Sequence, residues 1–285
     1  MKDVTNAMRA RILTAAVPYI KQYTDQYVVV KYGGNAMIDE ELKKSVMKDL
    51  MLLQLVGVKV VLVHGGGPAI NSTLDAMKIE SHFANGLRVT DEATMDVVQM
   101  VLAGKVNKGL VADLTDLGGK AVGLCGVDGN MIQVHKQNDE LGYVGSIDTI
   151  DTSIIDDVIS RGYIPVISSI GMGADGKTYN INADTVAAKI AGALKAETMV
   201  AMTNIDGVLR DVHDPESLIS KITMAEADQL KADGIIAGGM IPKVDCCLEA
   251  IKSGAQKVFI INGEIPHAIL IELLTDEGLG TMFVK

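Results

Sequence analysis

The sequence has 285 residues, of which 48% are hydrophobic and 22% charged, and its formal net charge is −10. These values are typical of a globular protein with one large α/β domain or two lobes. The acidic balance, the lack of a Lys/Arg-rich run and the absence of Trp argue against nucleic acid or a membrane surface as the main partner. Because no signal sequence and no apolar run near ~18 residues is visible, we expect a cytoplasmic protein.

Residues 5–22 carry apolar side chains at helical spacing, and Pro18 is expected to interrupt that helix. A helix ahead of the first core strand has no obvious place in a sheet. It could pack on its own domain or dock on another subunit, and the pattern alone leaves both open.

The first core strand runs into a lysine and a glycine pair, in the stretch Val28-Val29-Val30-Lys31-Tyr32-Gly33-Gly34-Asn35. Three β-branched residues in a row, without a helical period, predict a buried parallel strand. The glycine pair lets the backbone turn and bring its N–H groups near a ligand. A helix is expected from about Asp39, so the lysine, the glycine pair and the helix start together favour a phosphate ligand.

The same device recurs where the strand predicted over residues 58–63 runs into His64-Gly65-Gly66-Gly67-Pro68. A helix is expected over residues 69–77, with Pro68 in its first turn. Two such loops would lie side by side at the carboxyl edge of one sheet, where ligands bind in open α/β folds. A single glycine pair often only ends a strand, but two in this arrangement favour an anion site. The spacing fits neither a Walker loop nor the dinucleotide-binding fingerprint.

The rest of the chain alternates between strands and helices. Helices are predicted over residues 39–56, 91–106, 108–117, 152–160, 182–194, 223–232, 243–253 and 266–274. Strands are predicted over residues 120–125, 163–168, 198–203, 257–261 and 281–284, with surface hairpins between residues 126 and 146. This alternation predicts an α/β fold, an open and mainly parallel sheet with helices on both faces in a three-layer αβα sandwich. A boundary between two lobes is expected near residues 170–185.

Three charged residues are candidates for chemistry. Asp184, in the first turn of a predicted helix, either stabilises the helix dipole or holds two phosphate-handling lysines in place. Lys243 follows Gly238-Gly239 at a helix start, where a cation opposes the dipole unless a bound polyanion offsets it. Arg88 lies in a polar segment expected to face the first two glycine loops. It could bind a substrate carboxylate with two hydrogen bonds, although a surface arginine is commoner.

The cysteines and histidines do not predict a metal site. Cys125, Cys246 and Cys247 lack Cys-x-x-Cys spacing, and the five histidines are scattered along the chain. We therefore expect reduced cysteines and no metal bound by protein side chains. No Ser/His/Asp or Cys/His arrangement predicts a nucleophile. His64 is the only histidine that adjoins a glycine loop.

With these segments assembled, the chain resembles the amino acid kinase family over nearly its whole length. Lys31-Tyr32-Gly33-Gly34 and residues 63–68 match the two glycine loops of that family. Residues 203–209 and 238–243 match its nucleotide-site loop and its second catalytic lysine. Together, residues 86–90 and 180–184 resemble the members that act on N-acetyl-L-glutamate.

The resemblance implies roles for individual residues. Lys31 and Lys243 are expected to act on the transferring phosphoryl group, with Asp184 organising both lysines. Substrate contacts are implied for Gly66, Gly67, Arg88 and Asn180. Phosphate or ATP contacts are implied for Gly33, Gly34, Asn204, Asp206, Val208, Leu209, Gly238, Gly239 and Met240. Asn204 stands where relatives commonly carry Asp, which concerns the nucleotide contacts and not the chemistry.

The implied activity is ATP-dependent phosphorylation of the γ-carboxylate of N-acetyl-L-glutamate, giving N-acetyl-L-glutamyl 5-phosphate in arginine biosynthesis. Mg²⁺ is expected to arrive with the nucleotide. The alternatives are a member of the family that acts on glutamate, aspartate, carbamate or UMP, and a non-catalytic amino-acid sensor. An oxidoreductase that uses a dinucleotide is disfavoured because no Gly-x-Gly-x-x-Gly fingerprint is present.

The two ends of the chain resemble the arginine-inhibited members, whose extra N-terminal helix links dimers into a hexamer, a trimer of dimers. An L-arginine effector site is implied for Tyr19, Lys195, His267, Glu272, Gly278 and Gly280, with plain helix packing and a turn as the alternative. Three parts are implied: an oligomerisation helix (residues 1–26), an N-lobe for acetylglutamate binding and dimerisation (27–180) and a C-lobe for ATP and arginine (181–285).

Overall fold

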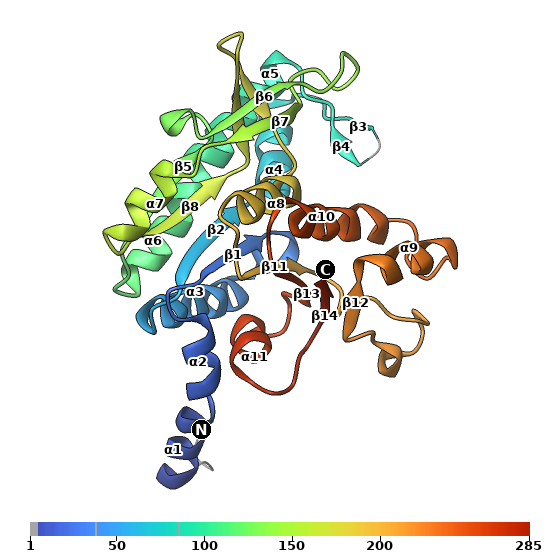
Figure 1. Ribbon diagram of the computed structural model, residues 1–285. Helices are drawn as coiled ribbons and strands as arrows, with labels where there is room; N and C mark the ends of the chain where they lie inside the picture. The colour runs from blue at the N-terminus through green and yellow to red at the C-terminus, as the bar shows by residue number, and fades with distance from the viewer. Residues whose placement is uncertain (1–4, 38, 85) are drawn as a thin grey trace.

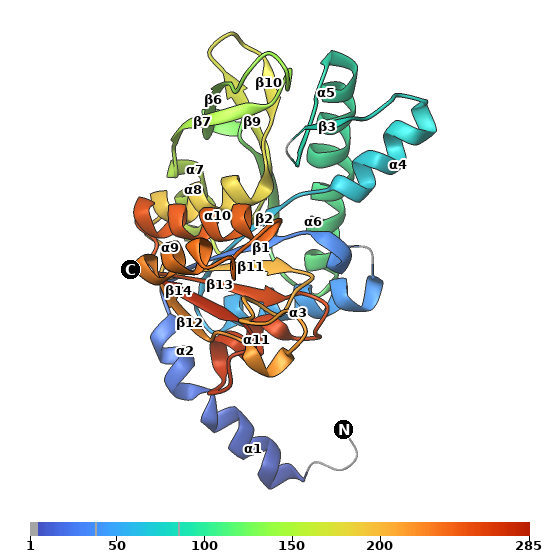
Figure 2. The ribbon, with the colours of Figure 1, turned by 90° about the vertical axis from the view of Figure 1, so that its right-hand side faces the viewer.

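One long sheet crosses the molecule and carries helices on both faces (Figures 1 and 2). The computed structural model describes residues 5–37, 39–84 and 86–285, and in these residues the sheet has eight strands. Their order is β12 (Lys221–Thr223), β14 (Thr281–Val284), β13 (Lys257–Asn262), β11 (Thr198–Thr203), β1 (Tyr27–Tyr32), β2 (Lys59–His64), β8 (Ile164–Ser168) and β5 (Ala121–Cys125).

The predicted α/β fold with a mainly parallel sheet is confirmed. Strands β13, β11, β1, β2, β8 and β5 are parallel to their neighbours in this series, and β14 pairs with β13 in the antiparallel direction. The edge strand β12 is parallel to β14. A smaller sheet stands at one end of the molecule, with the order β10 (Thr178–Asn180), β9 (Ile170–Gly173), β6 (Ile132–Lys136) and β7 (Gly145–Ile150).

The helices bury both faces of the long sheet. One face packs against α7 (Ser153–Ser160), α8 (Ala183–Ala193), α9 (Met224–Ala232) and α10 (Met240–Ser253). The other face packs against α2 (Val17–Tyr23), α3 (Glu40–Leu55), α6 (Asn107–Asp116) and α11 (Ala268–Leu274). The remaining elements are α1 (Asn6–Ala15), η1 (Gly34–Met37), α4 (Gly67–Met77), β3 (Phe83–Ala84), β4 (Leu87–Arg88), α5 (Glu92–Gln99), the π-helical η2 (Met100–Val106), η3 (Asp128–Asn130) and η4 (Pro215–Ser217).

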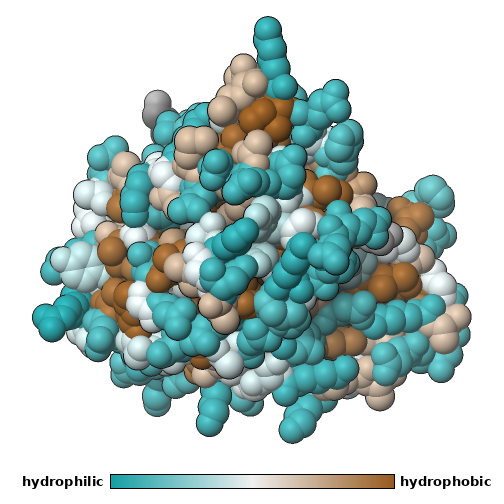
Figure 3. All heavy atoms as spheres, turned by 90° about the horizontal axis from the view of Figure 1, so that it is seen from above, coloured by the Kyte–Doolittle hydropathy of each residue, from teal (hydrophilic) through white to brown (hydrophobic). Residues whose placement is uncertain are grey.

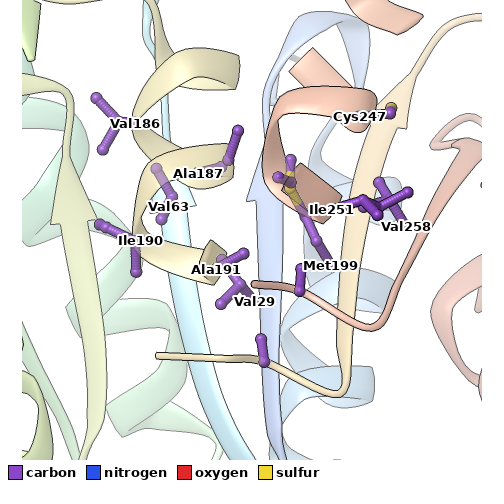
Figure 4. Packing of buried hydrophobic residues seen from close by; sticks show 14 of the residues in the cluster. Val29, Val63, Val186, Ala187, Ile190, Ala191, Met199, Cys247, Ile251 and Val258 are labelled. Atoms are coloured by element: carbon purple, nitrogen blue, oxygen red, sulfur yellow. The ribbon is translucent and has the colours of Figure 1, made fainter. Parts of the chain in front are cut away.

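The run of valines in β1 is explained by the helices that pack on both faces of the sheet. Val29 belongs to the core under α8 and α10, whereas Val28 and Val30 belong to the core on the opposite face. Figure 4 shows Val63 of β2 beside Ala187 and Ile190 of α8, and Val29 of β1 next to Ala191. Complete burial of one such side chain contributes about 1.5–3 kcal/mol, so a strand covered on both faces is apolar throughout.

Several local predictions are confirmed. Pro18 lies in the first turn of α2, and the N-terminal helix is divided there into α1 and α2. Asp39 caps α3 by accepting hydrogen bonds from two backbone N–H groups, and Asn182 caps α8 in the same way. Pro68 lies in the first turn of α4. The predicted β-structure between residues 126 and 146 is the β6–β7 hairpin.

Other local predictions differ from the structure. The two helices expected over residues 91–106 and 108–117 form one continuous helical segment. It consists of α5, the π-helical η2 and α6, which follow one another without a break. Helix α10 begins at Met240, three residues before the predicted start. Strand β12 was not predicted, because three residues at a sheet edge carry no clear alternation. The division into lobes at residues 180 and 181 stays a prediction, and residues 1–4 of the N-terminal part lie outside the described residues.

On the face seen from above, hydrophilic side chains are widespread and hydrophobic ones form scattered patches (Figure 3). Among the described residues, no helix is both long and apolar enough to cross a membrane.

The close packing of α8 on α10 yields a stability prediction. A Cβ added at Gly192 of α8 would lie 2.3 Å from Ser253 Cβ, whereas a Cβ at Gly109 of α6 would meet no atom within 4 Å. Gly192→Ala should therefore lower the free energy of unfolding by about 1–3 kcal/mol through overpacking. Gly109→Ala should raise it by roughly 0.5–1 kcal/mol, since alanine favours the helix. Denaturant unfolding of both variants checks this, and equal effects would contradict the packing.

Candidate active site

The site lies at the carboxyl edge of the central strands, where Lys31 and Asp184 form an ion pair. Lys31 is near the end of β1, and its Nζ lies 3.0 Å from Asp184 Oδ1 in the first turn of α8. Both side chains are largely buried, with 11% and 25% of their areas exposed. A Cβ at Gly33 would lie 3.2 Å from Lys31 Nζ, so a glycine there leaves room for the ammonium group.

Lys243 completes a group of three charges but has a different partner. Its Nζ donates a hydrogen bond to Thr203 Oγ1 at 2.8 Å, at the end of β11. Burial is the main cause that lowers the pKa of Lys243; Asp184 raises this pKa and Lys31 lowers it. The three charged groups therefore act on one another across a small space, in which Asp184 pairs directly with Lys31 and Thr203 holds Lys243.

A cavity of about 170 Å³ is lined in part by Asn182 and Ala183, the two residues before Asp184. The second glycine loop, β4, the end of β10 and the start of α8 form its walls. Gly66, Gly67, Arg88 and Asn180 all line this cavity, so the structure brings the four predicted substrate residues together. Its volume suits a small metabolite better than a large ligand.

Arg88 is buried in this cavity wall with neutral partners. Its Nη2 donates a hydrogen bond to Asn71 Oδ1 at 2.6 Å, its Nη1 donates to Ser81 Oγ, and the guanidinium lies 4.7 Å from the centre of the Phe83 ring. Burial lowers the pKa of Arg88. Within the described residues, no carboxylate forms a salt bridge with Arg88. A buried arginine held by neutral groups retains its charge and is chemically suited to bind a ligand carboxylate.

Asn180 is tied to the same wall. Its Nδ2 donates a hydrogen bond to Thr90 Oγ1 at 3.3 Å, and Thr90 Oγ1 donates to the carbonyl of Arg88 at 2.8 Å. The backbone N–H of Asn180 is bonded to the carbonyl of Tyr143. These contacts hold Asn180 and Arg88 at fixed positions on opposite segments of the chain.

Apart from Gly33 and Gly34, which follow β1, the residues predicted to contact the nucleotide lie in two segments. The first follows β11, where Asp206 Oδ1 accepts a hydrogen bond from Asn262 Nδ2 at 2.8 Å. In the same segment, the Val208 N–H donates to Thr281 Oγ1 at 2.8 Å, and Leu209 forms a β-bridge with Leu218. The second segment is the start of α10, with Gly238 at a φ of 52° and Gly239 as the N-cap. Asn204 directly follows Thr203, and Met240 opens the helix that carries Lys243.

The residues predicted to bind arginine lie mostly around α11. His267 precedes this helix, and its Nδ1 lies 2.6 Å from Asp49 Oδ1 of α3. Glu272 Oε2 accepts hydrogen bonds from the N–H groups of Leu279 at 2.6 Å and Gly280 at 3.1 Å. Burial raises the pKa of Glu272.

The other residues predicted to bind arginine differ in their positions relative to α11. A Cβ at Gly278 would lie 3.2 Å from Glu272 Oε1, and Tyr19 of α2 packs in the core that includes α11. Lys195 follows α8 in a left-handed conformation. In the part of the chain that the structure describes, no hydrogen bond or ion pair joins Lys195 to the others.

Sequence reasoning named Asp184 as the partner of the lysines but did not identify the residues that hold Lys243 and Arg88. Thr203 was part of a matched segment, but nothing in the pattern indicated its bond to Lys243. Asn71 and Ser81, which hold Arg88, are ordinary polar residues in a helix and a loop. Only their positions in the fold distinguish them.

Two lysines, a carboxylate and glycine loops beside a cavity with a buried arginine define a site for transfer of a phosphoryl group to a carboxylate-bearing substrate. Residues 26–262 match the amino acid kinase family. The chain belongs to this family. It is 52% identical over 287 residues to an acetylglutamate kinase of Brachyspira hyodysenteriae, covering 100% of both chains. It is 54% identical over 275 residues to an acetylglutamate kinase of Clostridium kluyveri, covering 96% and 97%.

The fold is also similar to that of an N-acetylglutamate synthase from Neisseria gonorrhoeae, solved in complex with coenzyme A and N-acetyl-glutamate. The TM-score is 0.84 and the identity 27%, over 97% of this chain and 63% of the synthase. The chain thus corresponds to a part of that longer protein and to the full length of the curated relatives.

The bond between Lys243 and Thr203 predicts how turnover depends on pH. The ammonium form of Lys243 is present at low pH and is lost as the pH rises through its pKa. Burial lowers this pKa, so the loss occurs at a lower pH than for an exposed lysine. Thr203→Val removes the acceptor that favours the ammonium form, so the alkaline limb of kcat should move to lower pH. Thr203→Ser, which keeps the hydroxyl, should leave that limb in place. Identical pH profiles for the two variants would contradict the role of the hydroxyl.

Proposed function

We propose that the protein uses MgATP to phosphorylate the γ-carboxylate of N-acetyl-L-glutamate, a step in arginine biosynthesis. The observation that carries this proposal is the cavity with Arg88 and Asn180, which is lined by the second glycine loop and reaches Ala183, the neighbour of Asp184 in the Lys31–Asp184 ion pair. Acetylglutamate kinases are about as long as this chain and share about half of its residues.

In this proposal, Arg88 binds the α-carboxylate of the substrate, and the amide of Asn180 binds a polar group beside it. Arginine suits this task because its planar fork matches a carboxylate. The bonds to Asn71 and Ser81 already fix the guanidinium, so little side-chain entropy is lost on binding. The substrate is then held with its γ-carboxylate directed toward Lys31.

The reaction needs positioning and charge stabilisation. An oxygen of the γ-carboxylate forms a bond to the γ-phosphorus of ATP while the bond from that phosphorus to the β–γ bridging oxygen breaks, and ADP leaves. The carboxylate is already ionised at neutral pH, so no general base is required. Lys31 and Lys243 stabilise the charge on the phosphoryl and bridging oxygens, and the N–H groups of Gly34, Gly66 and Gly67 donate to the γ-phosphate.

The nucleotide would bind over the segments after β11 and before α10. Cationic Lys243 and the N-terminus of α10 fit a polyphosphate, since both favour negative charge. The described residues include no group of three or more His, Cys, Asp or Glu side chains that could hold a metal ion. Mg²⁺ is therefore proposed to enter with ATP, where it neutralises phosphate charge.

Substitution of Lys243 tests the proposed chemistry. Lys243→Ala should lower kcat by about 10²–10³, the usual effect of losing one group that stabilises transition-state charge. The KM for N-acetyl-L-glutamate should change only a fewfold. Lys252→Ala, at an exposed position on the same helix, is the matched control and should retain full activity. ADP release measures both, and a kcat within a fewfold of wild type for Lys243→Ala would refute its role.

The choice of substrate is tested with the same assay. N-acetyl-L-glutamate should be turned over, and free L-glutamate, aspartate, carbamate and UMP should not. Turnover of one of these four would identify another kinase of the family. Binding of arginine without turnover of any substrate would identify an amino-acid sensor.

We further propose that the protein is a cytoplasmic hexamer inhibited by L-arginine. Helix α1 projects from the body of the molecule (Figure 1). Its side chains Met8, Ile12 and Leu13 are 55%, 60% and 72% exposed, which favours a partner helix from another subunit. Around α11, the half-buried carboxylate of Glu272 offers negative charge to a guanidinium next to Gly278, and Tyr19 packs against the same core as α11.

Arginine inhibition is tested at Glu272. Glu272→Gln keeps the size of the side chain but removes its charge, so it should raise the arginine concentration for half inhibition at least tenfold and leave uninhibited turnover intact. Glu277→Gln, at an exposed neighbouring position, should behave as wild type. Absence of any inhibition of the wild-type enzyme would remove the effector site and leave the kinase proposal standing.

A further inference from the structure

His64 is a fully buried histidine beside the active site for which the proposed chemistry has no role. It ends β2 and immediately precedes the second glycine loop. Its Nδ1 lies 2.7 Å from the carbonyl oxygen of Gly65, and its Nε2 lies 3.1 Å from Asn107 Nδ2. A buried polar ring with both nitrogens bonded has a fixed orientation, which is a reason to ask what it holds in place.

The surroundings of Asn107 determine which nitrogen of His64 carries the proton. Asn107 Nδ2 also donates hydrogen bonds to the carbonyls of Val166 at 2.8 Å and Leu124 at 3.3 Å. Two carbonyl acceptors require the amide nitrogen on this side, and that nitrogen can only donate. Its two N–H groups face three acceptors, so one N–H is shared, and His64 Nε2, which faces this donor, is the unprotonated ring nitrogen. The proton then lies on Nδ1, which donates it to the Gly65 carbonyl. Burial lowers the pKa of His64 to about 4, so the ring is neutral near pH 7.

The bond to Gly65 has a consequence for Gly66. The peptide bond between them is trans, so the Gly65 C=O and the Gly66 N–H point in opposite directions. A carbonyl held against His64 therefore fixes the direction of the Gly66 N–H. Both glycines line the substrate cavity, and within the described residues no acceptor is bonded to the Gly66 N–H.

This peptide needs an anchor because glycine lies on both sides of it. Glycine adopts a wide range of backbone angles, so a run of three would otherwise allow the peptide plane to rotate. On the other side, a Cβ at Gly66 would lie 2.6 Å from Leu102 Cδ2, which means that the backbone packs directly against η2. The loop is thus confined by η2 and oriented by His64.

We propose that His64, with its tautomer set by Asn107, is a positioning residue that orients the Gly65–Gly66 peptide so that the Gly66 N–H donates to a ligand oxygen. This inference rests on the proposed function, in which the second glycine loop contacts the γ-phosphate. His64 does not touch the substrate and acts through Gly66 alone. A misdirected N–H donor loses most of its effect on a developing charge, because such effects depend on alignment.

Two substitutions separate the role of Nδ1 from that of the ring as a packing group. The amide nitrogen of asparagine reaches the position of Nδ1, whereas that of glutamine reaches the position of Nε2. His64→Asn can therefore keep the bond to the Gly65 carbonyl, and His64→Gln cannot. The exposed His135, whose Nδ1 lies 2.7 Å from Asp148 Oδ1, provides matched controls in His135→Asn and His135→Gln.

The expected result is a kcat for His64→Asn within about fivefold of wild type and a kcat for His64→Gln at least tenfold below that of His64→Asn. The larger fall follows from the roughly 10²–10³ effect of one such donor. The KM for N-acetyl-L-glutamate should change less than kcat, and both His135 variants should match wild type. Thermal unfolding checks that the two His64 variants are equally folded. Equal kcat values in folded His64→Asn and His64→Gln overturn the proposal.

A measurement on the wild-type protein tests the same inference without any variant. The ¹⁵N chemical shifts of the His64 ring should show a protonated Nδ1 and an unprotonated Nε2 near pH 7. The opposite tautomer overturns the proposal, even if neither variant folds. If wild type shows this tautomer but does not turn over N-acetyl-L-glutamate, the proposed function is wrong while the orientation of the peptide stands.

Discussion

The parallel pairing of β1 with β2 is the constraint on which the site depends. Their register places Lys31 opposite Val63 and Tyr32 opposite His64, so the two strands end at the same level of the sheet. The glycine loops that follow them must then lie next to each other, with backbone N–H groups at one edge. Helix α8 enters from the end of β10 and brings Asp184 to Lys31, which couples the small sheet to this edge of the long sheet.

This edge gathers more positive charge than its own acids balance. Lys31 has Asp184, but Lys243 is bonded to the neutral Thr203, and Arg88 is bonded to neutral side chains in a buried wall. Buried cations without counter-charges reduce stability, and bound anions offset that cost. Such a departure from the usual pairing of charges is typical of functional sites.

The proposed effector region is physically connected to the same edge. Strand β13 pairs with β11 so that Asn262 lies opposite Thr203, the partner of Lys243. The chain leaves β13 at Asn262 and enters α11, which packs against α2 and α3. A ligand that moves α11 would therefore act on a segment that begins beside Thr203, the partner of Lys243. The proposed inhibitory and catalytic sites share one pair of strands.

The sequence by itself determined the elements whose signals are local. The valine runs of β1 and β2, the glycine loops after them and the caps at Asp39 and Asn182 are each specified within a few residues. These features, together with the matched motifs, were enough for the fold class and the family. Tertiary structure alone decided how the functional side chains are held: Lys243 by Thr203, Arg88 by Asn71, His64 by Asn107. Each of these pairs joins different segments of the chain, so it depends on strand order, register and helix packing, and no local pattern of residues can specify it.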